Sequence, residues 1–123
     1  MQDRIRFIDH KGKRILLVDL SNCPVDQTED VVRKVPDYIT VQPLRSVLVL
    51  TDFTGANFNR DAVRAIKETA VFDKPFVKKS ALVGIEGLAP SFYDELTSFS
   101  RRDMTIFKTR NAALDWLTSD SAP

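Results

Sequence analysis

Hydrophobic and polar positions follow two different periods along the chain, and the change of period marks the predicted elements. Residues 4–9 alternate charged and bulky side chains, and residues 14–20 form an almost continuous apolar run after a glycine-containing loop. Two such segments joined by a short glycine loop are typical of a β-hairpin. We therefore expect the first strand to run antiparallel to the second.

Three further apolar runs are short enough to be buried strands, and they lie at 47–50, 80–85 and 104–107. After the second strand and after each of these runs, apolar residues recur every three or four positions, which predicts helices. The order is therefore ββαβαβαβα. Strands that alternate with helices pair in parallel through right-handed crossovers, so the sequence predicts an α/β domain with a mixed five-stranded sheet and an antiparallel first strand.

Local signals place the ends of the helices. Asp26-Gln27-Thr28-Glu29 has the acceptor and the returning glutamate of a capping box, which predicts the start of the first helix. Pro36 lacks an amide N–H, so this helix is expected to end near Val35 or to kink and continue to about Ile39. Asn59 has the side chain of a good N-cap for the second helix.

Length and charge limit the class of protein. The 123 residues fit one domain, predicted over 1–118, with a frayed tail at 119–123. With 18 Lys and Arg against 17 Asp and Glu, the net charge of +1 does not predict attraction to nucleic acid or acidic lipid. The pairs Lys78-Lys79 and Arg101-Arg102 flank predicted element ends, where long charged side chains normally stay in water. We therefore expect no nucleic-acid partner.

The compartment is predicted from two absences in the sequence. The chain has one cysteine, Cys23, so it forms no intramolecular disulfide, and a reducing compartment is the natural one. No apolar run approaches the roughly 18 residues that a membrane span needs, and the chain starts in an alternating strand rather than an apolar leader. We expect a soluble, cytoplasmic protein without a membrane span.

Few residues in the sequence suit catalysis. The single histidine, His10, and Cys23 are expected at opposite ends of the strand 14–20, roughly 20 Å apart at about 3.3 Å per residue, so they do not form a dyad. One histidine and one cysteine do not make a zinc-type cluster, and no glycine-rich phosphate loop occurs. We therefore predict no catalytic residues, no metal and no cofactor, and a role other than that of an enzyme.

The central apolar run Val47-Leu48-Val49-Leu50 is followed by a loop with the strongest functional signal in the chain. Open parallel sheets bind ligands and partners at the carboxyl ends of their strands, next to exposed helix starts. Thr54 precedes a glycine there, and the N–H groups at a helix start would suit a phosphate added to its hydroxyl. A loop or capping hydroxyl is its structural alternative, and a strand-end cap is the alternative for the neighbouring aspartate. The partner- or ligand-binding candidates are Asp52, Phe53, Gly55, Asn57, Phe58 and Asn59.

The element order, with Asp52-Phe53-Thr54-Gly55 after the central strand, resembles the STAS domain family of anti-sigma-factor antagonists typified by SpoIIAA. The closing segment 107–117 is similar to the SpoIIAA-like subgroup, which is grouped loosely with STAS and CRAL-TRIO-like lipid-binding domains. The resemblance implies a SpoIIAA-like βα superhelix and a phosphorylation switch at Thr54. The family loop usually continues to a second glycine, whereas this chain has Gly55-Ala56-Asn57-Phe58.

Three hypotheses about function remain open on the sequence, and the least favoured of them, an enzyme, would need an acid or base with a perturbed pKa in a pocket. The leading one is a non-catalytic regulatory or protein-interaction module with a protein partner. The alternative is a small carrier that binds an apolar or lipid-like ligand between helix and sheet, which aromatic residues favour, although most of them are more simply core residues. These aromatic residues are Phe53, Phe58, Phe72, Phe76, Phe92 and Phe99.

Self-association is the last expectation. Successive crossovers are expected to place the helices largely on one side of the sheet, yet the runs 47–50 and 81–83 offer apolar side chains to both sides. A bare apolar face of several hundred Å² is rare on a monomer. Either an end helix crosses to cover it or a second subunit does, and of these we favour a two-fold homodimer.

Overall fold

A computed structural model describes residues 3–119, so residues 120–123 of the predicted frayed tail lie outside the described residues. The elements alternate as the sequence predicts, with two short 3-10 helices, η1 and η2, in addition. Their bounds are β1 Ile5–His10, β2 Lys13–Asp19, α1 Val25–Ile39, β3 Val47–Asp52, α2 Arg60–Asp73, η1 Lys74–Phe76, β4 Val77–Val83, η2 Ile85–Gly87, α3 Phe92–Ser100, β5 Thr105–Phe107 and α4 Arg110–Thr118.

The sheet contains five strands in the order β1-β2-β3-β4-β5. β1 pairs antiparallel with β2, with Ile5 opposite Val18, and the other neighbouring pairs are parallel. Lys11 and Gly12 form the hairpin turn with φ of 50° and 80°, the left-handed conformation that a tight two-residue turn requires. The predicted α/β class and the mixed sheet with an antiparallel first strand are confirmed.

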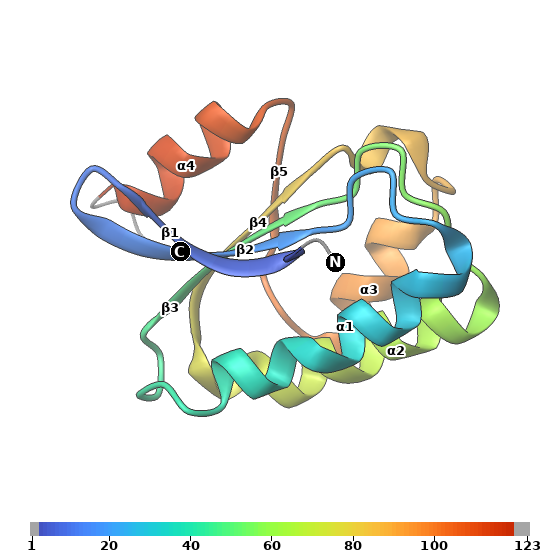
Figure 1. Ribbon diagram of the computed structural model, residues 1–123, viewed down its shortest axis with the longest axis horizontal. Helices are drawn as coiled ribbons and strands as arrows, with labels where there is room; N and C mark the ends of the chain where they lie inside the picture. Colours follow the sequence, from blue (N-terminus) through green and yellow to red (C-terminus); the bar gives the residue numbers. More distant parts are fainter. Residues whose placement is uncertain (1–2, 120–123) are drawn as a thin grey trace.

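Helices cover both faces of the sheet (Figure 1). α1, α2 and α3 lie on one face, and α4 lies on the other. Alternate residues of a strand point to opposite faces, so in β3 Val47 and Val49 belong to the core under α1–α3, whereas Leu48 and Leu50 belong to the core under α4. The prediction that the central strands are apolar on both sides is confirmed.

The expectation that the helices lie largely on one side is wrong for α4. A right-handed crossover fixes the side of a helix that connects two parallel strands, and α1, α2 and α3 are such helices. α4 follows the last strand, so the handedness rule does not constrain it, and it contacts β3, β4 and β5 on the second face. The homodimer was inferred from an apolar face that was expected to be bare, and α4 covers this face. The homodimer therefore stays a prediction, but the bare face no longer supports it.

The helix ends match the sequence in part. α1 continues through Pro36 to Ile39, which is the second of the two expected outcomes. It begins at Val25 without a side-chain cap, so the predicted capping box is wrong. Thr28 is buried instead, and its hydroxyl donates to the carbonyls of Pro24 and Asn57, both at 3.0 Å. A buried hydroxyl needs a partner, and here it joins α1 to the loop after β3.

α4 is fixed to the sheet by contacts along its whole length. Thr109 accepts a hydrogen bond from Ala112 at its start. The half-buried ring of Trp116 packs on Phe107 with centroids 5.4 Å apart. Lys79 of β4 is buried, and its Nζ donates to the Trp116 carbonyl at 3.0 Å, which satisfies a carbonyl in the last turn of the helix.

None of the helices within residues 3–119 combines the length and the apolar character that a membrane span requires.

Candidate functional site

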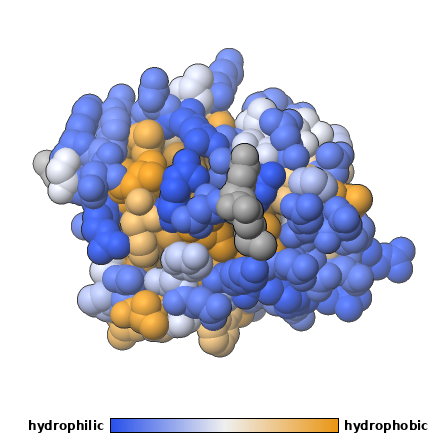
Figure 2. Space-filling model, viewed as in Figure 1, coloured by the Kyte–Doolittle hydropathy of each residue, from blue (hydrophilic) through white to orange (hydrophobic). Residues whose placement is uncertain are grey.

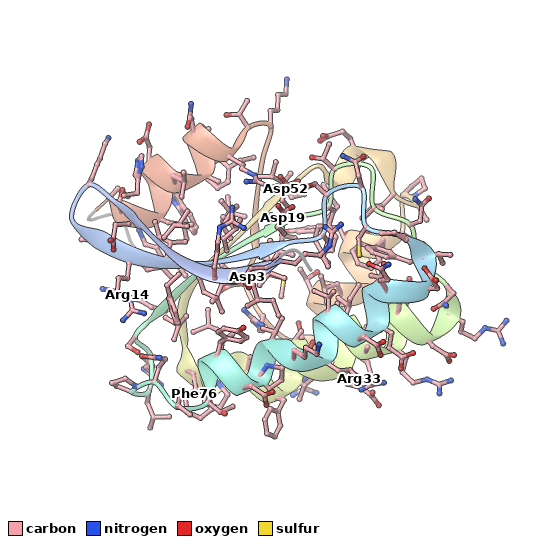
Figure 3. The ribbon with its side chains drawn as sticks, viewed as in Figure 1. Asp3, Arg14, Asp19, Arg33, Asp52 and Phe76 are labelled. Carbon is pink, nitrogen blue, oxygen red and sulfur yellow. The ribbon has the colours of Figure 1, made fainter. Side chains whose placement is uncertain are left out.

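Two acidic residues meet at the carboxyl ends of β2 and β3. Asp19 and Asp52 are the last residues of their strands and are partners in the parallel register, and Figure 3 shows them close together at this edge. Arg110, the first residue of α4, binds both carboxylates. Its Nε lies 2.7 Å from Asp52 Oδ2, and its Nη2 lies 3.1 Å from Asp19 Oδ1. The guanidinium therefore offsets part of the charge of the two acids and ties α4 to the strand ends.

The charges at this edge stabilise one another. Burial raises the pKa of Asp19, but hydrogen bonds from Ser21 and the charge of Arg110 outweigh burial, so the pKa lies below its usual value. Burial also lowers the pKa of Arg110, and the hydrogen bond and charge of Asp52 and Asp19 reverse this and raise it above its usual value. Asp19 and Arg110 are therefore both charged at neutral pH.

The loop after β3 is held through the same carboxylate. Asp52 Oδ1 accepts a hydrogen bond from the Thr54 amide at 2.9 Å, while its other oxygen binds Arg110. The Thr54 carbonyl accepts from the Asn22 amide at 2.8 Å, and the Phe53 amide donates to Val83 at 2.8 Å. The backbone on both sides of the Thr54 side chain is thus hydrogen-bonded to neighbouring loops and strands.

Two glycines allow these loops to approach closely. Gly84 has φ of 77°, and a Cβ placed on it would lie 2.3 Å from Thr54 Oγ1 and 2.4 Å from the Thr54 amide nitrogen. Gly55 has φ of 67°, and a Cβ there would lie 2.2 Å from Asn22 Oδ1. Both positions have the left-handed conformation, and Gly84 also needs the absence of a side chain because the backbone of Thr54 lies against it, whereas the neighbour of Gly55 is the exposed Asn22 side chain. The loops after β2, β3 and β4 therefore form one packed unit.

Aromatic rings pack between the Asp52–Asn59 loop and the start of α3. The ring of Phe53 meets Phe58 and Phe92 edge-on, with centroids 5.7 and 5.6 Å apart, and Phe58 lies 5.4 Å from Phe92. Asn59 caps α2 by accepting from Ala62 at 2.8 Å, as predicted. The loop is thus anchored at its start by Phe53 and at its end by Asn59.

The predicted site residues fall into an exposed group and a buried group. Asp52 and Phe53 are 5% and 1% exposed, so Asp52 acts as a strand-end cap and the Phe53 ring is part of the core rather than of a contact surface. Phe58 is half-buried. The exposed members are Thr54, Gly55, Asn57 and Asn59.

The Thr54 hydroxyl stands apart from the rest of this hydrogen-bonded loop. Within residues 3–119 it makes no hydrogen bond, and the capping role at α2 belongs to Asn59. Of the structural alternative considered for Thr54, a loop or capping hydroxyl, the capping role is therefore not realised, and Thr54 is a hydroxyl on an exposed loop. The side chain is exposed, and its backbone is fixed by Asp52 and Asn22.

Sequence reasoning missed Asp19, Arg110 and Gly84. For Asp19 a signal existed, because it ends an apolar strand just as Asp52 does, and neighbouring parallel strands bring such residues together. For Arg110 the sequence held no such signal, because its contact with the two carboxylates depends on which face of the sheet α4 covers. Gly84 follows an apolar run, but its role depends on the path of the loop after β3.

The described part of the chain offers no arrangement of metal ligands. Among residues 3–119, no three side chains of His, Cys, Asp or Glu are grouped to hold a metal ion. His10 hydrogen-bonds Asp115 at 2.9 Å at the far end of the hairpin, and Cys23 is fully buried. The exposed polar groups of the Asp52–Asn59 loop are the Thr54 hydroxyl and the side-chain amides of Asn57 and Asn59.

A small cavity lies between the sheet and the helices α1–α3. Its volume is about 60 Å³, and apolar residues such as Val35, Leu82 and Leu96 form most of its lining. Asp73 also lines it, is 3% exposed, and has one carboxylate oxygen without a hydrogen bond. Burial raises the pKa of Asp73 to about 6, although the charge of Arg102 opposes this.

The fold and the site define an α/β domain whose loops after β2, β3 and β4 pack against one another around an exposed threonine. Comparison with models of protein families, with curated proteins and with solved structures found no match. The resemblance to the STAS family rests on the residues of the loop and on the order of the elements.

Proposed function

We propose that this protein is a non-catalytic regulatory or protein-interaction module of the cytoplasm, with a SpoIIAA-like fold and a role like that of an anti-sigma-factor antagonist. Its contact surface is the Asp52–Asn59 loop with the start of α2. The observation that carries the proposal is the Thr54 hydroxyl, which is exposed, makes no hydrogen bond within residues 3–119, and sits on a backbone fixed by Asp52 and Asn22. A loop ordered before binding loses little entropy when a partner docks.

Phosphorylation of Thr54 is the proposed switch. A phosphate adds about −1.5 to −2 charges. Arg110, the guanidinium that binds Asp52, is already shared by Asp19 and Asp52, so it leaves the added charge largely uncompensated. A helix start stabilises an anion by about 0.3–1 kcal/mol, whereas an unpaired charge buried in an interface costs about 2–5 kcal/mol. The effect on a partner complex therefore exceeds the effect on the fold.

The test compares one charge at two positions. A partner is first captured with the wild-type chain, and its affinity is then measured for Thr54→Glu and for Ser98→Glu. Ser98 is exposed on α3, outside the Asp52–Asn59 loop, so it controls for the added charge. Thr54→Glu should weaken the complex about 30-fold or more, from the lower end of the interface cost, and Ser98→Glu should leave it unchanged.

Thermal unfolding and circular dichroism establish that both variants are folded, which is expected for exposed positions. Thr54→Ala adds a second comparison, because it removes the hydroxyl without adding a charge and should bind like the wild-type chain. Equal affinity of the partner for wild type and Thr54→Glu contradicts the switch. A partner whose affinity is changed only by substitutions outside the loop contradicts the contact surface.

A carrier is the second candidate, and the apolar cavity between sheet and helices is the observation that favours it. Its volume of about 60 Å³ is well below the roughly 150 Å³ of a cavity known to hold benzene. A lipid-like ligand would therefore need the helices to move apart. Native mass spectrometry of freshly purified protein separates the two functions, because a carrier retains a ligand mass and an interaction module does not.

A further inference from the structure

The opposite edge of the sheet, at the amino end of β4, concentrates positive charge. A groove of about 610 Å³ lies there, and among the residues that line it are six basic side chains and one acid, Asp103. The whole chain has a net charge of only +1, so this concentration is local. The basic residues are Arg45, Lys74, Lys78, Lys79, Arg101 and Arg102.

Four of these cations are available at the surface. Arg45, Lys74, Lys78 and Arg101 are exposed, and within residues 3–119 none of the four forms an ion pair. The other two are engaged in the fold, since Lys79 is bonded to the end of α4 and Arg102 donates to the Ala70 carbonyl at 3.2 Å.

The fold brings these residues together from three separate segments. The loop after α1 is tied to η1, because the amides of Arg45 and Ser46 donate to Pro75 and Phe76 at 3.0 and 3.1 Å. Arg101 ends α3 with φ of 54°, the left-handed conformation that turns the chain back toward β5. The sequence prediction treated the pairs at 78–79 and 101–102 as isolated solvated ends, whereas they share one groove.

Exposed apolar residues lie close in the sequence to two of these cations, Arg45 and Lys74. Of the large hydrophobic residues that the structure exposes, Val41, Leu44 and Phe72 are the three most exposed, at 75%, 68% and 62%. Leu44 precedes Arg45, and Phe72 lies at the end of α2 that leads into Lys74. Figure 2 shows apolar surface at the lower edge of the molecule, over the loop between α1 and β3. A contiguous exposed apolar patch indicates an interaction site.

We propose that this edge is a peripheral binding surface for a membrane that contains anionic lipids. The four exposed cations would bind headgroup phosphates and carboxylates, and Leu44 and Phe72 would enter the boundary between headgroups and acyl chains. A second copy of the chain fits poorly, because a two-fold contact would place like charges together. Nucleic acid would use the cations but leave Val41 and Leu44 exposed, since neither aliphatic chain stacks on a base.

The first measurement is co-sedimentation of the full chain with vesicles. Vesicles of phosphatidylcholine alone are compared with vesicles that also contain phosphatidylserine. The protein should sediment with the anionic vesicles and not with the neutral ones, and added salt should weaken the binding because the phosphate contacts are screened. Binding to both kinds of vesicle alike, or to neither, overturns the proposal.

Matched charge reversals locate the surface. Lys74→Glu with Lys78→Glu should weaken binding to anionic vesicles at least about 25-fold, since each basic residue near such a surface strengthens binding about fivefold. Arg60→Glu with Lys108→Glu changes the net charge equally at the other edge and should have a much smaller effect. Arg60 and Lys108 are exposed beside the starts of α2 and α4, where acids are tolerated.

The apolar residues are tested separately. Leu44→Ser with Phe72→Ser keeps every charge and should still weaken binding severalfold, and the exposure of both residues predicts an unchanged melting temperature. Equal loss in the two charge-reversal variants would show that only net charge matters and would overturn the assignment. Full vesicle binding by the Leu44→Ser, Phe72→Ser variant would also overturn the proposal. So would a wild-type chain that binds a single-stranded oligonucleotide but not the vesicles.

Discussion

Gly84→Ala tests the close approach of two loops on which the candidate site depends. The substitution has two effects that the structure separates. Gly84 has φ of 77°, a conformation that costs an L-residue about 1–2 kcal/mol. The added Cβ would also lie 2.4 Å from the Thr54 nitrogen and 2.7 Å from its Cα, so the backbone of the loop after β3 must shift.

Gly12→Ala provides the matched control. Gly12 has φ of 80°, nearly the value at Gly84, but a Cβ there meets nothing within 4 Å. The stability loss of Gly12→Ala therefore comes only from the left-handed conformation. Alanine also restricts the unfolded chain, which offsets about 0.4–1 kcal/mol of that loss. We expect a loss of about 1 kcal/mol for Gly12→Ala. Overpacking typically adds about 1–3 kcal/mol, so Gly84→Ala should lose about 2–4 kcal/mol.

Urea unfolding of both variants measures the difference directly. In thermal unfolding, the melting temperature of a domain of this length should fall by about 3–5 °C for each kcal/mol. We expect a decrease of about 10 °C for Gly84→Ala and of about 4 °C for Gly12→Ala. Equal losses in the two variants would refute the reasoning, because the backbone of Thr54 would then not lie against Gly84.

Two further predictions concern the two cores. Trp116→Ala removes a half-buried ring that packs on Phe107, so the free energy of unfolding measured with urea should fall by about 2–4 kcal/mol. Trp116→Phe keeps an aromatic ring at this position and should lose much less. An unchanged value for Trp116→Ala would show that α4 is peripheral. The pKa of Asp73 is raised to about 6 by burial, so its charged form opposes folding, and its contribution to stability should decrease as pH rises from about 4 to 6. The difference in unfolding free energy between wild type and Asp73→Asn should therefore change by about 2–3 kcal/mol across that range, and a constant difference contradicts a buried, ionisable Asp73.

The order of the elements could be predicted because the hydrophobic pattern is set by local geometry. Val47-Leu48-Val49-Leu50 is apolar at every position, and a strand with both faces buried requires this. Asn59 was predicted correctly as a cap because its amide needs to reach only three residues along the chain. Signals that depend on residues only a few positions apart can be recognised in the sequence itself.

Contacts between distant segments could not be predicted in the same way. Thr28 has the sequence context of a capping residue, but a partner 29 positions away, Asn57, takes part in its hydrogen bonding. The basic residues at 45, 74, 78 and 101 form one groove only after the loop following α1 is tied to η1. Neither arrangement leaves a periodic pattern, because each depends on the path of a loop.

The position of α4 connects these points. Once this helix lies on the second face, its first residue, Arg110, reaches the carboxylates of Asp19 and Asp52. Asp52 in turn holds the Thr54 amide, so the helix that closes the second core also orders the exposed loop. From there α4 runs back to the opposite edge of the sheet, where its last turn binds Lys79 of the basic groove. A partner at the Thr54 loop and a membrane at the basic groove would therefore meet opposite edges of one sheet and need not compete.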